Sequence, residues 1–190
     1  MGLDMYLYNV KKCSLEEGKT YTSEQLQDFK NLVTCDISDK VCDTIKNHST
    51  KITCIEKVIV PEKLGKLAGI KETVKYIRMC IQSFDGNSCK TTYALMDEKY
   101  NEVGKYTLDS SKEEDLNAVL KDQEFEYYAF ILEEIDYQRK GLTEMGWSLL
   151  PDNCEYCDDY DVVERLSEHG LSISFIDKWK DGKTIFVPWW

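Results

Sequence analysis

The chain has 190 residues, of which 42% are hydrophobic and 31% charged, enough for one compact domain with a hydrophobic core, or for one domain with an insertion. Its 12% of aromatic residues argue against disorder. The net charge of -11 opposes nonspecific binding to nucleic acid, since such binding rests on the neutralisation of phosphates by Lys and Arg. A protein partner with a basic surface would suit this charge, although the plainer interpretation is that acidity keeps the protein soluble.

The sequence contains neither a run of about 18 apolar residues nor a basic start that would mark a signal peptide. We therefore expect a cytoplasmic protein without membrane association. Eight cysteines are many for such a protein. Without a secretory signal, we expect reduced thiols, several of them in the core, and no disulfide framework.

The first residues predict a strand followed by a helix. Residues 3–9 alternate in polarity, as a strand does. Thr22 and Gln25 form a capping-box pattern, which predicts a helix over about residues 23–33.

Residues 35–87 predict a strand and two helices, but their first part predicts no element. Residues 35–48 show no clean period. Residues 51–60 are rich in β-branched side chains and predict a strand, which Pro61 ends as the first residue of a short helix. Apolar residues at helical spacing predict a helix over 70–83, and Asp85-Gly86-Asn87 stops it.

The middle of the chain predicts two strands, a helix and one ambiguous segment. Residues 91–95 and 103–108 are strand-like, and 110–121 carry a helix with acidic residues in its first turn. Residues 124–139 fit a strand period and a helix period about equally well. Their aromatic and β-branched content favours a long strand, with a helix as the alternative.

The last part predicts two helices and a closing hairpin. Residues 142–150 and 161–169 have helical patterns, the second with a capping-box-like start. Residues 171–179 and 183–189 are strand-like, and Asp181-Gly182 between them is typical of a hairpin turn.

These elements predict an α+β fold in a single domain over residues 1–190, with residues 35–110 as the place for an inserted subdomain. We expect a mainly antiparallel sheet that includes both chain termini, with about four to five helices packed on it. The aromatic ends of the chain favour this arrangement, because chain ends are usually polar unless they are held in place.

A pair of thiols, Cys154 and Cys157, has the spacing of a metal chelate, and His169 follows as a candidate third ligand. Zinc would be the expected metal, and a small metal-dependent or thiol enzyme centred on this pair is the alternative function. The acidic neighbours of the pair raise a thiol pKa, which opposes redox chemistry. Two structural thiols near a loop are the favoured interpretation, and the sequence suggests no catalytic residue.

Carboxylates and aromatic residues alternate in the C-terminal half. If they share a face, that face would steer and select a basic partner; the alternative is several unrelated solvated faces. Helix capping is the plainer role for the acidic residues near 161–169. The candidate partner-binding residues are Glu133, Glu134, Glu155, Tyr156, Asp158, Asp159, Tyr160 and Asp161.

Several motifs resemble a family of small phage and prophage proteins. The opening Met1–Tyr6, the stretch Asp136–Lys140, Trp147 in a helix and the closing Phe186–Trp190 are similar to the motifs of that family, although Gln138 stands where the family has Trp. The resemblance implies a mobile-element accessory protein in the host cell cytoplasm. It also implies binding and inhibition of a host or defence protein, such as a CRISPR nuclease, and no catalytic residues.

Overall fold

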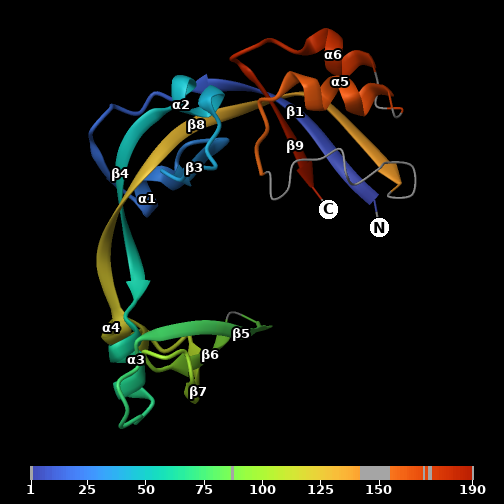
Figure 1. Cartoon of the computed structure of the whole chain (residues 1–190). Helices are drawn as coiled ribbons and strands as arrows, with labels where there is room; N and C mark the ends of the chain where they lie inside the picture. Colours follow the sequence, from blue (N-terminus) through green and yellow to red (C-terminus); the bar gives the residue numbers. More distant parts are fainter. Residues whose placement is uncertain (1, 87, 142–154, 169, 171–172, 190) are drawn as a thin grey trace. The chain divides into compact units, whose positions relative to one another are not determined.

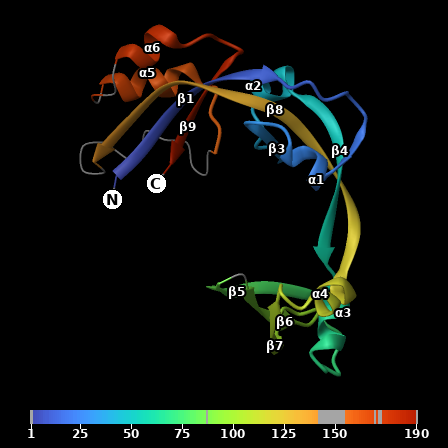
Figure 2. The ribbon, with the colours of Figure 1, turned by 180° about the vertical axis from the view of Figure 1, so that it is seen from behind.

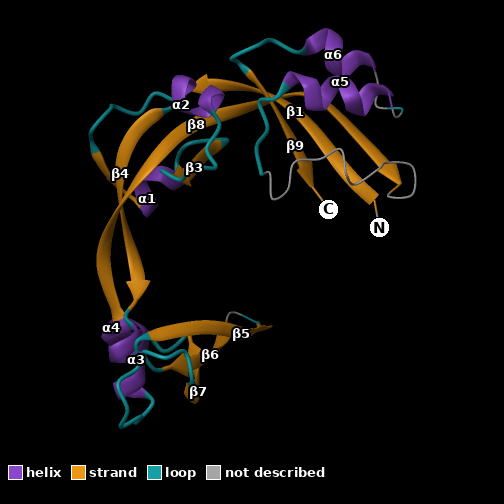
Figure 3. Cartoon of the chain, viewed as in Figure 1, coloured by secondary structure: helices purple, strands orange, loops and turns teal. Residues whose placement is uncertain are grey.

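The computed structural model describes residues 2–86, 88–141, 155–168, 170 and 173–189, and within them it contains nine strands and six helices (Figures 1 and 3). The strands are β1 Gly2–Lys12, β2 Thr20–Thr22, β3 Leu32–Asp36, β4 Thr50–Ile59, β5 Tyr76–Asp85, β6 Ser88–Met96, β7 Glu102–Asp109, β8 Leu120–Gly141 and β9 Thr184–Trp189. The helices are α1 Ser23–Gln27, α2 Asp43–His48, α3 Pro61–Leu67, α4 Glu113–Val119, α5 Tyr160–Glu168 and α6 Ile173–Lys178.

The expectation of one mainly antiparallel sheet with four to five helices on it is wrong. The described residues form two sheets: a six-stranded sheet in the order β2-β4-β8-β1-β9, with β3 also paired to β8, and a three-stranded sheet in the order β5-β6-β7. The larger sheet is mixed, because β2 runs parallel to β4. The described part of the chain is therefore α+β-like but richer in strands than the sequence predicts.

The chain divides into two compact units. Unit 1 comprises Met1–Ile55 and Glu124–Trp190, and unit 2 comprises Glu56–Gln123. The sequence suggested an inserted subdomain at residues 35–110, and unit 2 has different bounds. Strand β4 leads the chain into unit 2, and β8 leads it back into unit 1.

Both terminal strands lie in the larger sheet, as predicted. Strand β1 pairs antiparallel with β8 on one side and with β9 on the other, so that Leu7 stands opposite both Asp136 and Phe186. Figures 1 and 2 show β1 and β9 side by side. The Leu3 and Met5 side chains of β1 are buried, because they lie on the face that packs against residues of α5 and α6.

Helices cover both faces of the larger sheet in unit 1. The side chains that α5 and α6 bury pack against one face of β1 and β9, in a core of Leu3, Met5, Leu7, Cys157, Val162, Val163, Leu166, Phe175 and Phe186. Residues of α2 and of the segment before it pack on another core with Val10, Phe130 and Ile185. The same strands contribute to both cores because successive side chains of a strand point to opposite faces of the sheet.

The first predicted helix starts where expected but is shorter. Thr22 and Gln25 form the predicted capping box, and α1 ends at Gln27. Asn31 then adopts a positive φ of 60°, and the chain turns into β3. The apolar residues predicted for the end of this helix, Leu32 and Val33, face β8 as a strand instead.

The predicted helix over 70–83 is wrong, because residues 76–85 form strand β5. The apolar spacing that suggested a helix has another origin. Val74, Ile70 and Ile77 all pack on the core of unit 2, two of them from the connection before β5 and one from the strand itself. The predicted stop at Asp85-Gly86 is the tight connection to β6, with which β5 pairs from Tyr76 to Asp85.

The predicted closing hairpin is also wrong, because residues 173–178 form α6. The turn at Gly182, with a φ of 68°, joins α6 to β9. The strand at 183–189 and the long strand at 124–139 are confirmed by β9 and β8. The helix predicted over 142–150 lies outside the described residues.

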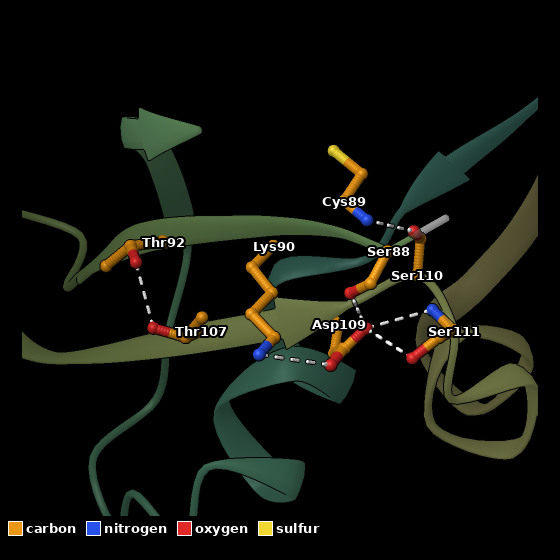
Figure 4. A network of polar contacts seen from close by, with 8 residues as sticks. All are labelled: Ser88, Cys89, Lys90, Thr92, Thr107, Asp109, Ser110 and Ser111. Carbon is orange, nitrogen blue, oxygen red and sulfur yellow. Dashed lines mark hydrogen bonds and ion pairs between the residues drawn. The ribbon is translucent and has the colours of Figure 1, made fainter. Parts of the chain in front are cut away.

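A polar network joins the ends of the strands in unit 2 (Figure 4). The Asp109 carboxylate accepts hydrogen bonds from the Ser111 backbone N–H at 3.0 Å, the Ser111 hydroxyl at 2.6 Å and the Ser88 hydroxyl at 2.9 Å. These bonds, together with Lys90 at 3.9 Å, lower the pKa of Asp109 to about 2. The network ties the start of β6 to the turn that leads into α4.

Candidate partner-binding surface

The predicted carboxylates divide into structural and exposed groups. Asp158 is half-buried and binds another element of the fold, as described below. Asp159 is exposed but accepts a hydrogen bond from the Asp161 backbone N–H at 2.9 Å at the start of α5, so part of the predicted capping role is present. Glu155 and Asp161 are exposed. Within the described residues, no Lys or Arg lies within 4.0 Å of Glu155, Asp159 or Asp161 to form an ion pair.

Asp158 caps a helix from a distant part of the chain. The N-cap of α2, Cys42, makes no side-chain capping bond. The Asp158 carboxylate instead accepts bonds from the Thr44 backbone N–H and from the Thr44 hydroxyl, both at 3.0 Å. The N–H bond is the one that a capping side chain normally supplies, so Asp158 ties the segment before α5 to the start of α2.

Strand β3 packs against the same core as the segments before α2 and α5. Cys35 of β3, Cys42 and Tyr156 are partly buried against that core. After burial and the neighbouring Asp36, Glu155 is a further cause that raises the pKa of the Cys35 thiol. Asp36 and Asp43, the first residue of α2, are exposed. We call the exposed carboxylates of these three segments the acidic surface: Asp36, Asp43, Glu155, Asp159 and Asp161.

The two tyrosines predicted for this surface are largely used for packing. Tyr156 meets Phe130 edge to face, with ring centroids 6.0 Å apart, and burial together with nearby thiols and Glu155 raises its pKa to about 12. Tyr160 lies 6.1 Å from Trp179 between ring centroids. Both side chains are half-buried, so they support the acidic surface more than they extend it.

Glu133 and Glu134 lie on opposite faces of β8, as neighbouring residues of a strand must. Glu133 forms a 2.6 Å ion pair with Lys11 on β1. Glu134 stands opposite Tyr8, and after burial it is the next cause that raises the pKa of that tyrosine. The structure therefore does not bring the two glutamates together.

Only one of the three candidate metal ligands is described. Cys157 is buried, and its backbone forms an antiparallel bridge with Phe186. Cys154 and His169 lie outside the described residues. Among the residues that are described, no three His, Cys, Asp or Glu side chains are grouped to hold a metal ion.

The thiols near Tyr156 are poor nucleophiles at neutral pH. Burial is the main cause that raises the pKa of Cys35 to about 11 and that of Cys42 to about 12. The thiolate is the reactive form of cysteine, so such shifts suppress reactivity. No disulfide joins any of the seven described cysteines.

Two motifs of the phage-protein resemblance contact each other. The Tyr137 hydroxyl donates a hydrogen bond to the Asp4 carboxylate at 2.8 Å, and Arg139 lies 3.5 Å from the same carboxylate. Asp136, at the start of the same motif, accepts bonds from Ser174 and Lys178 on α6. These motif residues therefore hold β1, β8 and α6 together.

Charge is unevenly divided between the two units. Most of the excess of acidic over basic residues belongs to unit 1, whereas the two kinds nearly balance in unit 2. In the described part of the chain, no helix has the length and apolar character needed to cross a membrane.

No protein-family model matches the chain, and no curated protein or solved structure matches it. The resemblance to phage proteins therefore rests on the motifs alone and stays a prediction.

Proposed function

We propose that this chain is a binding protein without catalytic activity, which docks its acidic surface on a protein partner with a basic surface. The observation that carries the proposal is the set of exposed carboxylates on three separate segments. The Asp158 bonds to Thr44 join two of these segments, and Cys35 of the third packs against the same core as Tyr156. A potential built in this way attracts basic surfaces and repels acidic ones, which steers association and selects the partner.

The partner that fits best is a protein that itself binds nucleic acid, because such proteins present clusters of Lys and Arg to phosphates. The motifs that resemble phage proteins extend this proposal to an accessory protein of a phage or mobile element. It would act in the host cell cytoplasm and occupy the nucleic-acid site of a defence nuclease, such as a CRISPR effector.

Binding to purified proteins tests the proposal. The panel contains nucleic-acid-binding proteins with basic clefts, RNA-guided nucleases among them, and one acidic protein. The test variant combines Glu155→Gln, Asp159→Asn and Asp161→Asn, and the amide introduced by Asp159→Asn keeps an oxygen for the capping bond. The control variant combines Glu72→Gln, Glu98→Gln and Glu114→Gln, which are exposed in unit 2 and change the net charge equally.

We expect wild-type protein to bind at least one basic protein of the panel, and more weakly as salt rises. The test variant should bind that protein at least roughly tenfold more weakly at low salt, and the control variant almost as tightly as wild type. Failure of wild type to bind any basic member, or equal weakening by both variants, would show the proposal to be wrong.

A further inference from the structure

Strand β5 forms an edge of the three-stranded sheet and is exposed along nearly its whole length. Its apolar side chains are among the most exposed of the described chain: Met79 is 60% exposed, Ile81 64% and Phe84 75%. Backbone groups along a sheet edge lack a partner on one side, and exposed apolar residues there favour pairing with another strand.

The opposite edge of the sheet differs. Strand β7 exposes the charged residues Glu102 and Lys105 and turns Tyr106 and Leu108 inward. Charged residues on an edge discourage pairing with another strand. The apolar character of β5 is therefore a local property and does not extend to both edges of this sheet.

A register shift in β5 aligns its side chains. The pairing with β6 skips Cys80, between Met79 opposite Tyr93 and Ile81 opposite Thr92. Phe84 stands opposite Cys89, which is an even number of residues from Tyr93, so Phe84 and Met79 lie on one face.

The charges of β5 follow the same pattern. Arg78 stands opposite Ala94 and Asp85 opposite Ser88, again an even number of residues apart, so the two charges share the other face. Neither Arg78 nor Asp85 has an ion-pair partner within 4.0 Å among the described residues.

We propose that β5 pairs antiparallel with β5 of a second copy of this chain, with Gln82 of both copies at the centre and Cys80 of each copy left out of the pairing, as it is in the pairing with β6. In this register Arg78 faces Asp85 of the second copy, and Met79 faces its Phe84. Two-fold symmetry makes each contact twice. A register shifted by two residues, the smallest shift that keeps paired side chains on one face, places Arg78 opposite Ser83 and leaves the charges uncompensated. Complementary charge therefore selects a second copy as the occupant, independently of the acidic surface.

Sedimentation velocity of the full chain from about 1 to 100 µM tests the pairing, a range in which weak and moderate dimers are resolved. We expect wild-type dimers. Arg78→Asp or Asp85→Arg alone should raise the dissociation constant at least roughly tenfold, because two attractive cross-strand pairs become repulsive. The double variant should restore the dimer, because it exchanges the two charges. Phe84→Ser should also weaken dimers, and Lys66→Asp, at an exposed position of α3, should not.

A monomeric wild type at the highest concentration would overturn the proposal. So would a dimer that persists in both single charge variants, because it would use another surface. Failure of the double variant to recover would exclude this register. Circular dichroism of each variant confirms that a loss of dimer is not a loss of fold.

Discussion

Asp158 accepts two hydrogen bonds from Thr44, which lies more than a hundred residues earlier in the chain and is almost fully buried. One carboxylate thus replaces the missing cap of α2 and holds the segment before α5 beside it. Asp158 is one of the predicted partner-binding residues, but this geometry gives it a structural role. Its hydrogen bonds hold together two segments that carry the acidic surface, but its own carboxylate is not one of the exposed carboxylates of that surface.

We expect Asp158→Ala to lower the free energy of unfolding by roughly 1–3 kcal/mol, because it removes a helix cap and leaves buried donors without an acceptor. Asp158→Asn keeps an acceptor oxygen and should cost less. Asp161→Asn is the matched control, since Asp161 is exposed, and should stay within about 0.5 kcal/mol of wild type. Urea denaturation measures all three. Equal losses for Asp158→Ala and Asp161→Asn would contradict the capping role.

Gly65 and Gly104 offer a contrast within unit 2. A Cβ at Gly65 would lie 2.5 Å from Val74 Cγ2, on a short and buried side chain. A Cβ at Gly104 would lie 2.6 Å from Ile70 Cδ1, the end of a flexible side chain. We expect Gly65→Ala to destabilise unit 2 by roughly 1–3 kcal/mol and Gly104→Ala by clearly less, as thermal unfolding would show.

Adding Val74→Ala to Gly65→Ala makes room for the new methyl group. The double variant should therefore lose less stability than the sum of the two single changes. Strict additivity would mean that the steric conflict is not the cause of the loss.

Asp109 should make unit 2 sensitive to acid. Its pKa is about 2 in the folded chain, with hydrogen bonds from Ser111 as the main causes, against roughly 3.9 for an unperturbed Asp. A depressed folded pKa stabilises the fold above the unfolded pKa, and this contribution disappears as the pH falls from about 4 to about 2. Asp109→Asn should lower the unfolding temperature at pH 7, and the difference from wild type should shrink over that interval.

Thermal unfolding at a series of pH values, for wild type and Asp109→Asn, measures this convergence. A difference that stays constant from about pH 7 to about pH 2.5 would show that ionisation of Asp109 does not contribute.

Cys35 and Cys42 should react slowly with iodoacetamide in the folded protein. Their pKa values of about 11 and about 12 lower the thiolate fraction near pH 8. Each pKa unit reduces it about tenfold, so we expect alkylation at least roughly tenfold slower than in urea-unfolded chain. Peptide mass spectrometry compares the same cysteines in both states. Equal rates would contradict the burial of these thiols.

The sequence predicts strands well where residues that favour strands also have a neighbouring strand to pair with. Residues 51–60 and 124–139 are rich in β-branched or aromatic side chains and form β4 and β8. Residues 70–83 mislead because Ile70, Val74 and Ile77 meet one core from a connection and a strand, a spacing that mimics a helix. The pairing of β5 with β6 makes this segment a strand, and a local sequence pattern carries no information about that pairing.

The candidate surface was partly predictable for a similar reason. The local density of acidic residues in 155–161 identifies its main segment. Asp36 and Asp43 were missed because only the core shared by Cys35 and Tyr156, and the Asp158 bond to Thr44, bring their segments to residues 155–161. An acidic first turn in α2 without a capping side chain at Cys42 was the available signal, and it did not reveal the distant cap.

Carbodiimide cross-linking of the complex with a basic partner tests the proposed docking surface most directly, because it joins carboxylates to lysines in contact. If the acidic surface docks on the partner, cross-links to partner lysines should arise from Asp36, Asp43, Glu155 and Asp161 and disappear in high salt. Cross-links that arise instead from the acidic residues of unit 2, such as Glu72, Glu98 and Glu114, would contradict the proposed function.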